Sequence, residues 1–228
     1  MLQQLGDSIW TFEQFIRFGG LPLRHRMTVI RLAEGGVLVH SPAARTAELA
    51  HELQEIGPVT AIVAPSWWHD LYLSDWLRVF PEAALYGAPT LVRLGRSLPF
   101  TGVLTNATPS LWAHDLEGHH VEGIGLFLDE VAFYHRASGS LIVADLLFNL
   151  DENDRGLTKI LAPIVIGPVP GCRFARLYRP FILDRRSFRV SIKRILEWNF
   201  HRIIVGHGAV VENEGKEVFR SAFRWLLK

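Results

Sequence analysis

Cysteine is almost absent from this chain of 228 residues, in which Cys172 stands alone. One cysteine cannot close a disulfide within the chain or build a cysteine-based zinc cluster. Such scarcity is typical of proteins in reducing compartments, and we expect a cytoplasmic location. The N-terminus has no basic segment followed by an apolar core, so no signal peptide is expected. No apolar run reaches the length of a membrane span, and residues 160–169 form a short run with two prolines.

An excess of either charge is also missing, because 24 lysines and arginines face 23 aspartates and glutamates. This balance gives no electrostatic reason to expect nucleic acid or an anionic membrane as a partner. Residues 172–194 are locally basic. We interpret them as a solvated face whose arginine stems lie on apolar surface, with an anion-binding patch as the alternative. The expected partner is a small-molecule substrate, and nothing in the sequence indicates an oligomeric state.

The remaining composition is that of an ordinary globular protein, with 49% hydrophobic and 21% charged residues. A chain of this length can bury a large core, and we expect a single domain over residues 1–228. Strand patterns come in pairs and threes, separated by helical patterns. This order predicts an α/β (α+β) fold with two facing sheets and helices outside, a four-layer αββα sandwich.

Buried strands are predicted where apolar and β-branched residues run together, at 27–32, 37–40, 59–64, 130–135, 140–145 and 202–205. Helices are predicted from apolar spacing at 43–56, 71–80, 88–94, 156–169, 187–198 and 214–228. Ser41 before Pro42 is a typical helix entry, and Ser187 is the expected cap of its helix. In that helix Val190 and Ile192 are expected to face inward with Ile195 and Leu196.

Polar side chains follow three of the buried strands at the point where each strand ends. Asp145 follows the apolar run 141–144, His207 follows 202–205 between two glycines, and Ser66, His69 and Asp70 follow 59–64. Histidine nitrogen and carboxylate oxygen are the ligands of zinc and related metals, provided that rigid elements bring them together. The alternative is that these residues are hydrogen-bonded structural groups. We favour that interpretation for His69 taken alone and for His40, at the end of a fourth strand, and leave both interpretations open for Asp145 and His207 together. The other histidines are expected at the surface: His25, His51, His114, His119, His120, His135 and His201.

With these motifs the chain resembles the metallo-β-lactamase fold superfamily over nearly its whole length. Members of that superfamily carry a segment like GHTPGHVAFY, a turn, a strand ending in GDLLF, and a late GHG-type histidine. The similar segments here are residues 125–134, residues 141–148 and His207. The resemblance implies an αββα sandwich and a metal-dependent hydrolase.

The chain also departs from the family pattern, which places an HxHxDH loop after the strand 59–64. Pro-Ser-Trp-Trp-His-Asp-Leu stands there, at 65–71, and neither of two registers restores the ligands. The histidine of the GHT-type segment is Leu126. The resemblance therefore implies at most one divalent metal (zinc, manganese or iron), or none, held by His69 or Asp70 with Asp145 and His207.

Two functions follow from this degenerate motif. In the first, the chain is a hydrolase with an atypical site, whose metal ligands are His69, Asp145 and His207 and whose catalytic residues are His69 and Asp70. In the second, the chain is a non-catalytic binding or interaction module in which these residues are structural. Trp67 and Trp68 are adjacent, so we expect one in the core and the other above the site.

Overall fold

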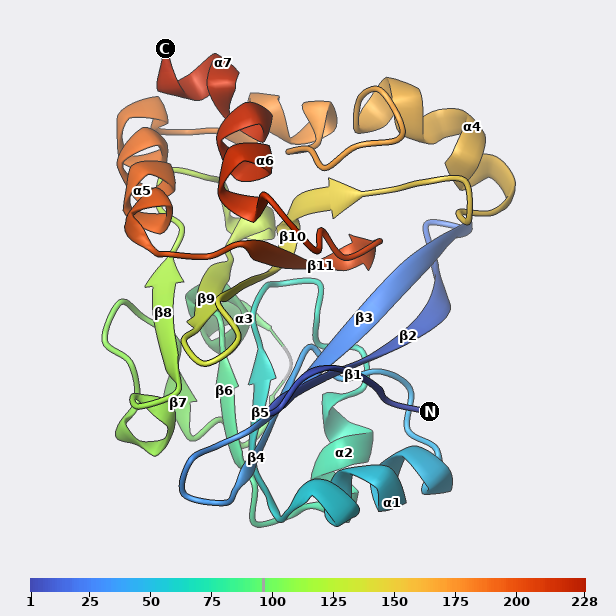
Figure 1. Ribbon diagram of the computed structural model, residues 1–228, viewed down its shortest axis with the longest axis vertical. Helices are drawn as coiled ribbons and strands as arrows, with labels where there is room; N and C mark the ends of the chain where they lie inside the picture. Colours follow the sequence, from blue (N-terminus) through green and yellow to red (C-terminus); the bar gives the residue numbers. More distant parts are fainter. Residues whose placement is uncertain (96) are drawn as a thin grey trace.

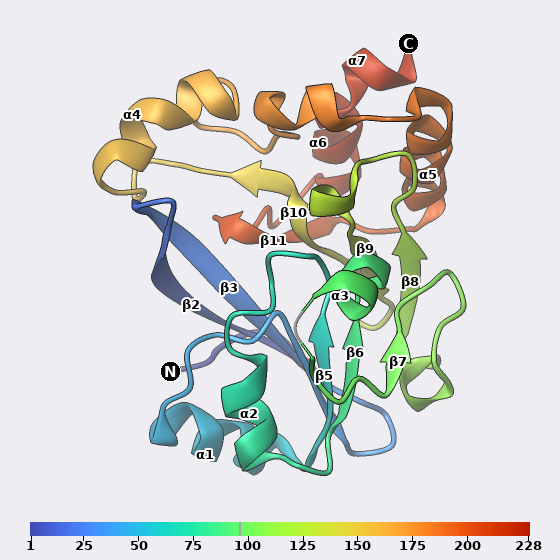
Figure 2. The same cartoon turned by 180° about the vertical axis from the view of Figure 1, so that it is seen from behind.

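The computed structural model describes residues 1–95 and 97–228, and in these residues two sheets lie face to face between layers of helices (Figures 1 and 2). The first sheet has the strand order β1-β2-β3-β4-β5-β6-β7 and the second has the order β11-β10-β9-β8. The strands are β1 (Gln3–Gly6), β2 (Ile9–Phe18), β3 (Leu21–Arg31), β4 (Val37–His40), β5 (Val59–Ala64), β6 (Ala84–Gly87), β7 (Gly102–Val103), β8 (Leu116–His120), β9 (Val131–His135), β10 (Ser140–Asn149) and β11 (Arg202–Gly208). The αββα architecture predicted from the sequence is confirmed.

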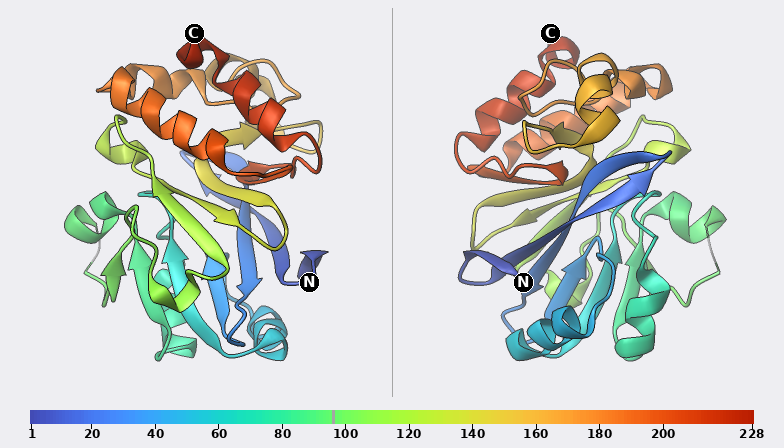
Figure 3. Two further views of the ribbon diagram at one scale, coloured as in Figure 1. Left: turned by 60° about the vertical axis from the view of Figure 1, so that its left-hand side comes forward. Right: turned by 90° about the vertical axis from the view of Figure 1, so that its right-hand side faces the viewer.

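Helices cover the outer face of each sheet (Figure 3). They are α1 (Ala47–Ile56), α2 (Leu73–Val79), α3 (Pro89–Leu94), α4 (Gly156–Val165), α5 (Arg185–Glu197), α6 (Gly215–Ala222) and α7 (Arg224–Leu227), with short 3₁₀ turns η1 (Ser110–Trp112), η2 (Leu126–Leu128) and η3 (Arg176–Phe181). None of the described helices is long and apolar enough to cross a bilayer.

Strand direction explains why the candidate residues gather at one edge. Strands β1 to β4 are antiparallel, whereas β4, β5 and β6 run parallel to one another. In the second sheet β10 is antiparallel to β9 and parallel to β11. Parallel strands end at the same edge of a sheet, so the segments after β4 and β5 leave the first sheet together.

The alternation of side chains along the strands separates the core into layers. On β5, Ile62 packs towards helices α1 and α2, with Leu53 and Trp76. Its neighbour Val63 points to the opposite face and packs between the sheets. The cluster between the sheets includes Ile9, Ile30, Leu38, Ala61, Phe133, Ile142 and Ile204. Continuous apolar runs such as 59–64 are therefore buried on both faces, which is why they lack a polar alternation.

The ends of two helices differ from the prediction. Helix α1 begins at Ala47, where the Thr46 hydroxyl accepts a hydrogen bond from the Leu49 N–H, and not near Ser41. Helix α5 is capped by Asp184, whose side chain accepts hydrogen bonds from two backbone N–H groups, so the prediction of a Ser187 cap is wrong. Val190 is 61% exposed, which contradicts its expected inward position. The predicted C-terminal helix is interrupted at Phe223, between α6 and α7.

The basic segment 172–194 forms η3 and the start of α5. The guanidinium carbons of Arg179 and Arg185 lie 4.5 and 5.5 Å from the centre of the Trp225 ring. The two arginines therefore pack over a half-buried aromatic ring, as expected for cation–π contacts.

Candidate functional site

Asp145 lies in an irregular part of β10. The pairing of β10 with β11 shifts between Val143, opposite Val205, and Phe148, opposite His207. Residues 144–147 of β10 therefore face only Gly206 of β11, and this bulge turns the Asp145 carboxylate out of the sheet. A side chain at position 206 would place its Cβ 2.8 Å from the Ala144 carbonyl oxygen, so only glycine allows the approach.

The side chain of Glu130 stabilises this bulge through hydrogen bonds to its backbone. Its carboxylate accepts hydrogen bonds from the backbone N–H groups of Ala144, Asp145 and Leu146, at 2.8, 2.7 and 2.7 Å. Burial, followed by the charge of Asp145, raises the pKa of Glu130 to about 8 against the opposing effect of these donors. Burial and the neighbouring carboxylate of Asp145 thus disfavour ionisation of Glu130, whereas the three N–H donors favour it.

His69 reaches the same place from the loop after β5. Its Nδ1 is hydrogen-bonded to the Ser41 hydroxyl, and its Nε2 lies 3.5 Å from Oδ2 of Asp145. Ser66, in the same loop, donates a hydrogen bond of 2.6 Å to that carboxylate oxygen. All four side chains are buried. The structure thus selects His69, rather than Asp70, as the loop residue that faces Asp145.

His207 completes the group from the end of β11. Its Nδ1 donates a hydrogen bond of 2.6 Å to the Arg24 carbonyl oxygen on β3, and its Nε2 lies 3.2 Å from Oδ1 of Asp145. The Phe148 ring stacks on the imidazole with ring centres 5.2 Å apart. These contacts fix both the position and the tautomer of the ring.

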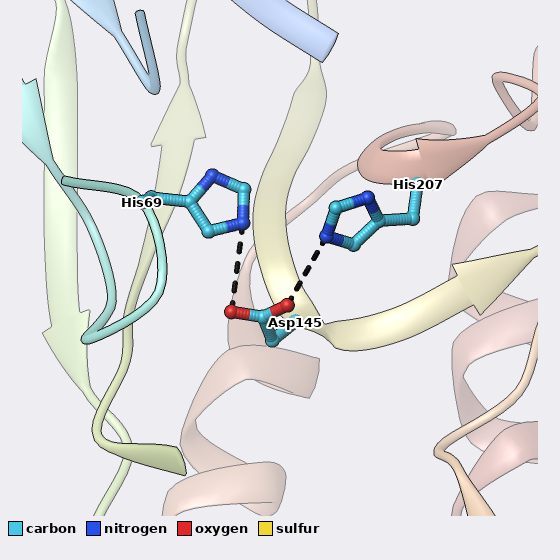
Figure 4. Close-up of side chains that lie close together, drawn as sticks. All are labelled: His69, Asp145 and His207. Carbon is cyan, nitrogen blue, oxygen red and sulfur yellow. Dashed lines mark hydrogen bonds and ion pairs between the residues drawn. The ribbon is translucent and has the colours of Figure 1, made fainter. Parts of the chain in front are cut away.

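Figure 4 shows the two imidazoles on either side of the Asp145 carboxylate. One ligand atom from each of His69, Asp145 and His207 lies within 4.8 Å of the other two. Two ligands on a tetrahedral zinc ion with bonds of about 2.0–2.2 Å are separated by about 3.3–3.6 Å. The Nε2 atoms of His69 and His207 lie 3.5 and 3.2 Å from different oxygens of Asp145, which is close to this separation for each pair. The three side chains therefore offer the donor types that a divalent metal ion prefers, from one small region.

The hydrogen bonds also restrict where protons can be. A carbonyl oxygen only accepts, so Nδ1 of His207 carries a proton and a neutral ring presents an Nε2 lone pair to Asp145. Two acceptors at 3.2 Å repel each other unless a cation lies between them. That cation is either a second proton on His207 or a metal ion. Burial by itself raises the pKa of Asp145, but the charge of His69 and the hydrogen bond from His207 outweigh it and hold the pKa well below its usual value.

The sequence interpretation missed His25, which neighbours this group, and also misplaced His135, which lies elsewhere against Ser8 and Ser138. His25 and His135 were expected at the surface, but both are buried, so that expectation is wrong for these two residues. The His25 ring centre lies 5.1 Å from that of His69 and 6.1 Å from that of His207. Burial, followed by the charges of these two histidines, lowers the pKa of His25 to about 3. The alternation of arginine and histidine at 24–26 in β3 was the signal, because polar residues at buried positions of a long strand indicate a site.

His40 is buried near His69, but within the described part of the chain it lacks the ring hydrogen bonds of the structural role expected for it. Burial, followed by the charge of His69, lowers its pKa to about 3, and its ring packs edge-on against Phe133 with centres 5.5 Å apart. Neither ring nitrogen has a hydrogen-bond partner among the described residues.

A pocket of about 620 Å³ opens over the His69, Asp145 and His207 group. Asp70 lines this pocket together with both tryptophans of its loop. Trp67 packs partly on the core beside α1 and α2, whereas Trp68 is 39% exposed and stacks on Phe127. The expectation of one core tryptophan and one above the site was too simple, because both form the pocket wall. Leu126 is 48% exposed at η2 and supplies no ligand.

A family model described as a domain of unknown function (DUF4336) matches residues 6–166. No curated protein sequence matches the chain. Among solved structures, a metallo-β-lactamase from Pontibacter korlensis superimposes with a TM-score of 0.66 at 14% identity, covering 98% of each chain. One from Hirschia baltica has a TM-score of 0.66 at 13% identity, covering 99% of this chain and 97% of that one. The DIM-1 metallo-β-lactamase has a TM-score of 0.67 at 16% identity with the same coverage. At these identities the similarity shows the fold, and the fold is that of the metallo-β-lactamases.

Proposed function

We propose, since the chain belongs to the DUF4336 family and has the metallo-β-lactamase fold, that it is a metal-dependent hydrolase with a single divalent ion. The ion would be held by His69, Asp145 and His207. The observation that carries the proposal is the convergence of three buried side chains, because one ligand atom from each of His69, Asp145 and His207 lies within 4.8 Å of the other two. Three protein ligands and one open position form the usual arrangement of a catalytic zinc site.

When bound, a divalent ion would supply Lewis acidity towards water and towards a carbonyl or phosphoryl oxygen. The protein positions the ligands through the Ser41 hydroxyl behind His69 and the Arg24 carbonyl behind His207. Asp70 lines the pocket beside His69, and we assign it the role of accepting a proton from the attacking water. Burial and the charges of Asp145 and Glu130 raise the pKa of Tyr178, so its phenol stays protonated and can donate a hydrogen bond to a substrate oxygen.

A second function, a binding module without metal, is favoured by one observation. Both oxygens of Asp145 already have partners, because Oδ2 accepts from Ser66 and Oδ1 faces His207. A doubly protonated His207 would complete this network without any ion, as a buried polar network must be complete to be stable.

Titration of zinc and manganese into chelator-treated protein separates the two functions. We expect one ion to bind per wild-type chain and none to bind Asp145→Ala or His207→Ala. Circular dichroism spectra should stay close to wild type, because both side chains line the pocket and belong to none of the buried apolar clusters. His114→Ala is the matched control, since this histidine is exposed and lies outside the group.

If the wild-type protein binds metal no better than the Asp145→Ala variant, the metal-dependent hydrolase is excluded and the binding module remains. Affinity should also weaken as pH falls through the range in which histidine takes up protons, because an imidazolium cannot ligate a metal.

A further inference from the structure

The pocket over the candidate metal site is lined mainly by apolar side chains. Its walls come from the tip of the β2–β3 hairpin, from α3, from α4 and from η3, and include Phe18, Leu23, Leu91, Leu161, Val165 and Leu177. A pocket of about 620 Å³ is within the size range that encloses a small organic ligand. The apolar character also extends to the mouth, where Phe18, Leu94 and Leu177 are 45, 55 and 56% exposed.

The polar groups of the pocket are concentrated at one place. His25, His69, Asp145 and His207 lie together at the site, and Asp70 and Tyr178 are the further polar groups near it. Thr158, on the α4 wall, already donates its hydroxyl to the Pro22 carbonyl oxygen. Among the described lining residues none is a lysine or arginine. An anionic ligand would therefore be desolvated without a cationic side chain to compensate its charge.

We propose that the substrate is a neutral, largely hydrocarbon ester whose carbonyl group lies at the His69, Asp145 and His207 group and whose hydrocarbon body fills the pocket. The reaction, though not the binding, rests on the proposed hydrolase function. In hydrolysis the oxygen of water bonds to the carbonyl carbon and the bond from that carbon to the alkoxy oxygen breaks. The alkoxy oxygen takes a proton and leaves as an alcohol, and the carboxylic acid releases its proton to solvent.

Chain length provides a quantitative expectation for binding. Burial of each additional CH₂ group contributes roughly a fourfold gain in affinity at about 0.8 kcal/mol per group. The dissociation constants of straight-chain methyl esters should therefore fall about fourfold per CH₂ and level off when the pocket is full. A carboxylate of the same length should bind more weakly than its methyl ester at neutral pH.

Displacement of a neutral apolar fluorophore, N-phenyl-1-naphthylamine, measures this binding without turnover. The protein is used as purified and again after chelator treatment, with methyl esters and matching carboxylates as competitors. In Leu161→Glu, a charge replaces an apolar wall, and we expect ester binding to weaken at least tenfold. The matched control is Ile160→Glu on the same helix, because Ile160 is 66% exposed and does not line the pocket. If Leu161→Glu fails to fold, Leu177→Glu at the exposed mouth takes its place.

Three results would overturn the inference: no dependence on chain length, equal binding of carboxylates and esters, or equal effects of the substitutions at 160 and 161. Ester binding by chelator-treated protein that takes up no metal would support the apolar pocket and exclude the hydrolase. Metal uptake without ester binding would support the metal site and exclude the ester as its substrate. The two proposals can therefore fail separately.

Discussion

At the scale of one residue, Ser41 combines a strained backbone with a hydrogen bond to a candidate ligand. Its φ of 54° lies in the left-handed region, which non-glycine residues rarely occupy. The residue is fully buried, and its hydroxyl is bonded to Nδ1 of His69. A strained residue of this kind persists when its surroundings require it, and here the requirement is the orientation of a candidate ligand.

Replacement of Ser41 by alanine and by glycine separates the hydroxyl from the strain. Both variants lose the hydrogen bond to His69, so metal affinity should fall roughly 10–100-fold in each, as for other partners of metal ligands. Glycine accepts a positive φ, so Ser41→Gly should melt at a higher temperature than Ser41→Ala. Metal titration and thermal melts measure the two effects. Wild-type metal affinity in both variants would show that the hydroxyl does not position His69.

His135 makes stability depend on pH. Its pKa is lowered to about 4, chiefly by burial, and its Nδ1 is hydrogen-bonded to the Ser138 hydroxyl. In the unfolded chain the ring has an ordinary pKa near 6.5, so between about pH 6.5 and 4 only the unfolded chain binds the proton. The unfolding free energy should therefore fall with decreasing pH in that window, by at most about 1.4 kcal/mol per pH unit from this ring.

His135→Gln removes this titration and should flatten the pH dependence by up to that amount. Urea denaturation of chelator-treated protein at about pH 7, 6 and 5 measures it, with the slope of the linkage relation as reference. His51→Gln is the control, because the His51 side chain is 73% exposed. Identical slopes for wild type and His135→Gln would contradict a buried neutral ring.

At the scale of an element, β10 was the strand most clearly predicted and the one most changed by its surroundings. The apolar run 141–144 was correctly taken as a buried strand, and the predicted end at Asp145 reflects the charge there. The strand continues to Asn149 because the bulge at 144–147 lets it pair again with His207 and Gly208 of β11. The bulge depends on Glu130, which lies on a different segment, so the local pattern could not predict it.

Glu130 can be tested as the partner of that bulge. Glu130→Ala leaves three buried N–H groups without acceptors, each at about 1–3 kcal/mol, so the unfolding free energy should fall by roughly 3 kcal/mol or more. Glu130→Gln keeps one accepting oxygen and should lose less. Chemical denaturation measures both, and Glu55→Ala is the control, since Glu55 is 67% exposed. A loss below about 1 kcal/mol in Glu130→Ala would remove Glu130 from this role.

For the whole molecule, the order of strand and helix patterns predicted the architecture better than local patterns predicted the positions of single residues. Apolar runs predicted the strands and the two-sheet architecture, because a strand that is buried on both faces is continuously apolar. His69, Asp145 and His207 were identified because each follows such a run. His25 and Ser41 were not identified as site residues, since their approach to the site depends on the pairing of β3 and on a left-handed backbone. Neither feature has a local sequence signature as strong as an apolar run.

The three candidate ligands belong to both halves of the sandwich, since His69 follows the first sheet and Asp145 and His207 lie on the second. An ion among them would be a crosslink between the sheets, formed only in the folded chain. At a free concentration 100 times its dissociation constant, such an ion would add about 2.7 kcal/mol to the unfolding free energy. Resistance of the protein to heat and to proteases would then rise and fall with the metal supply of its surroundings.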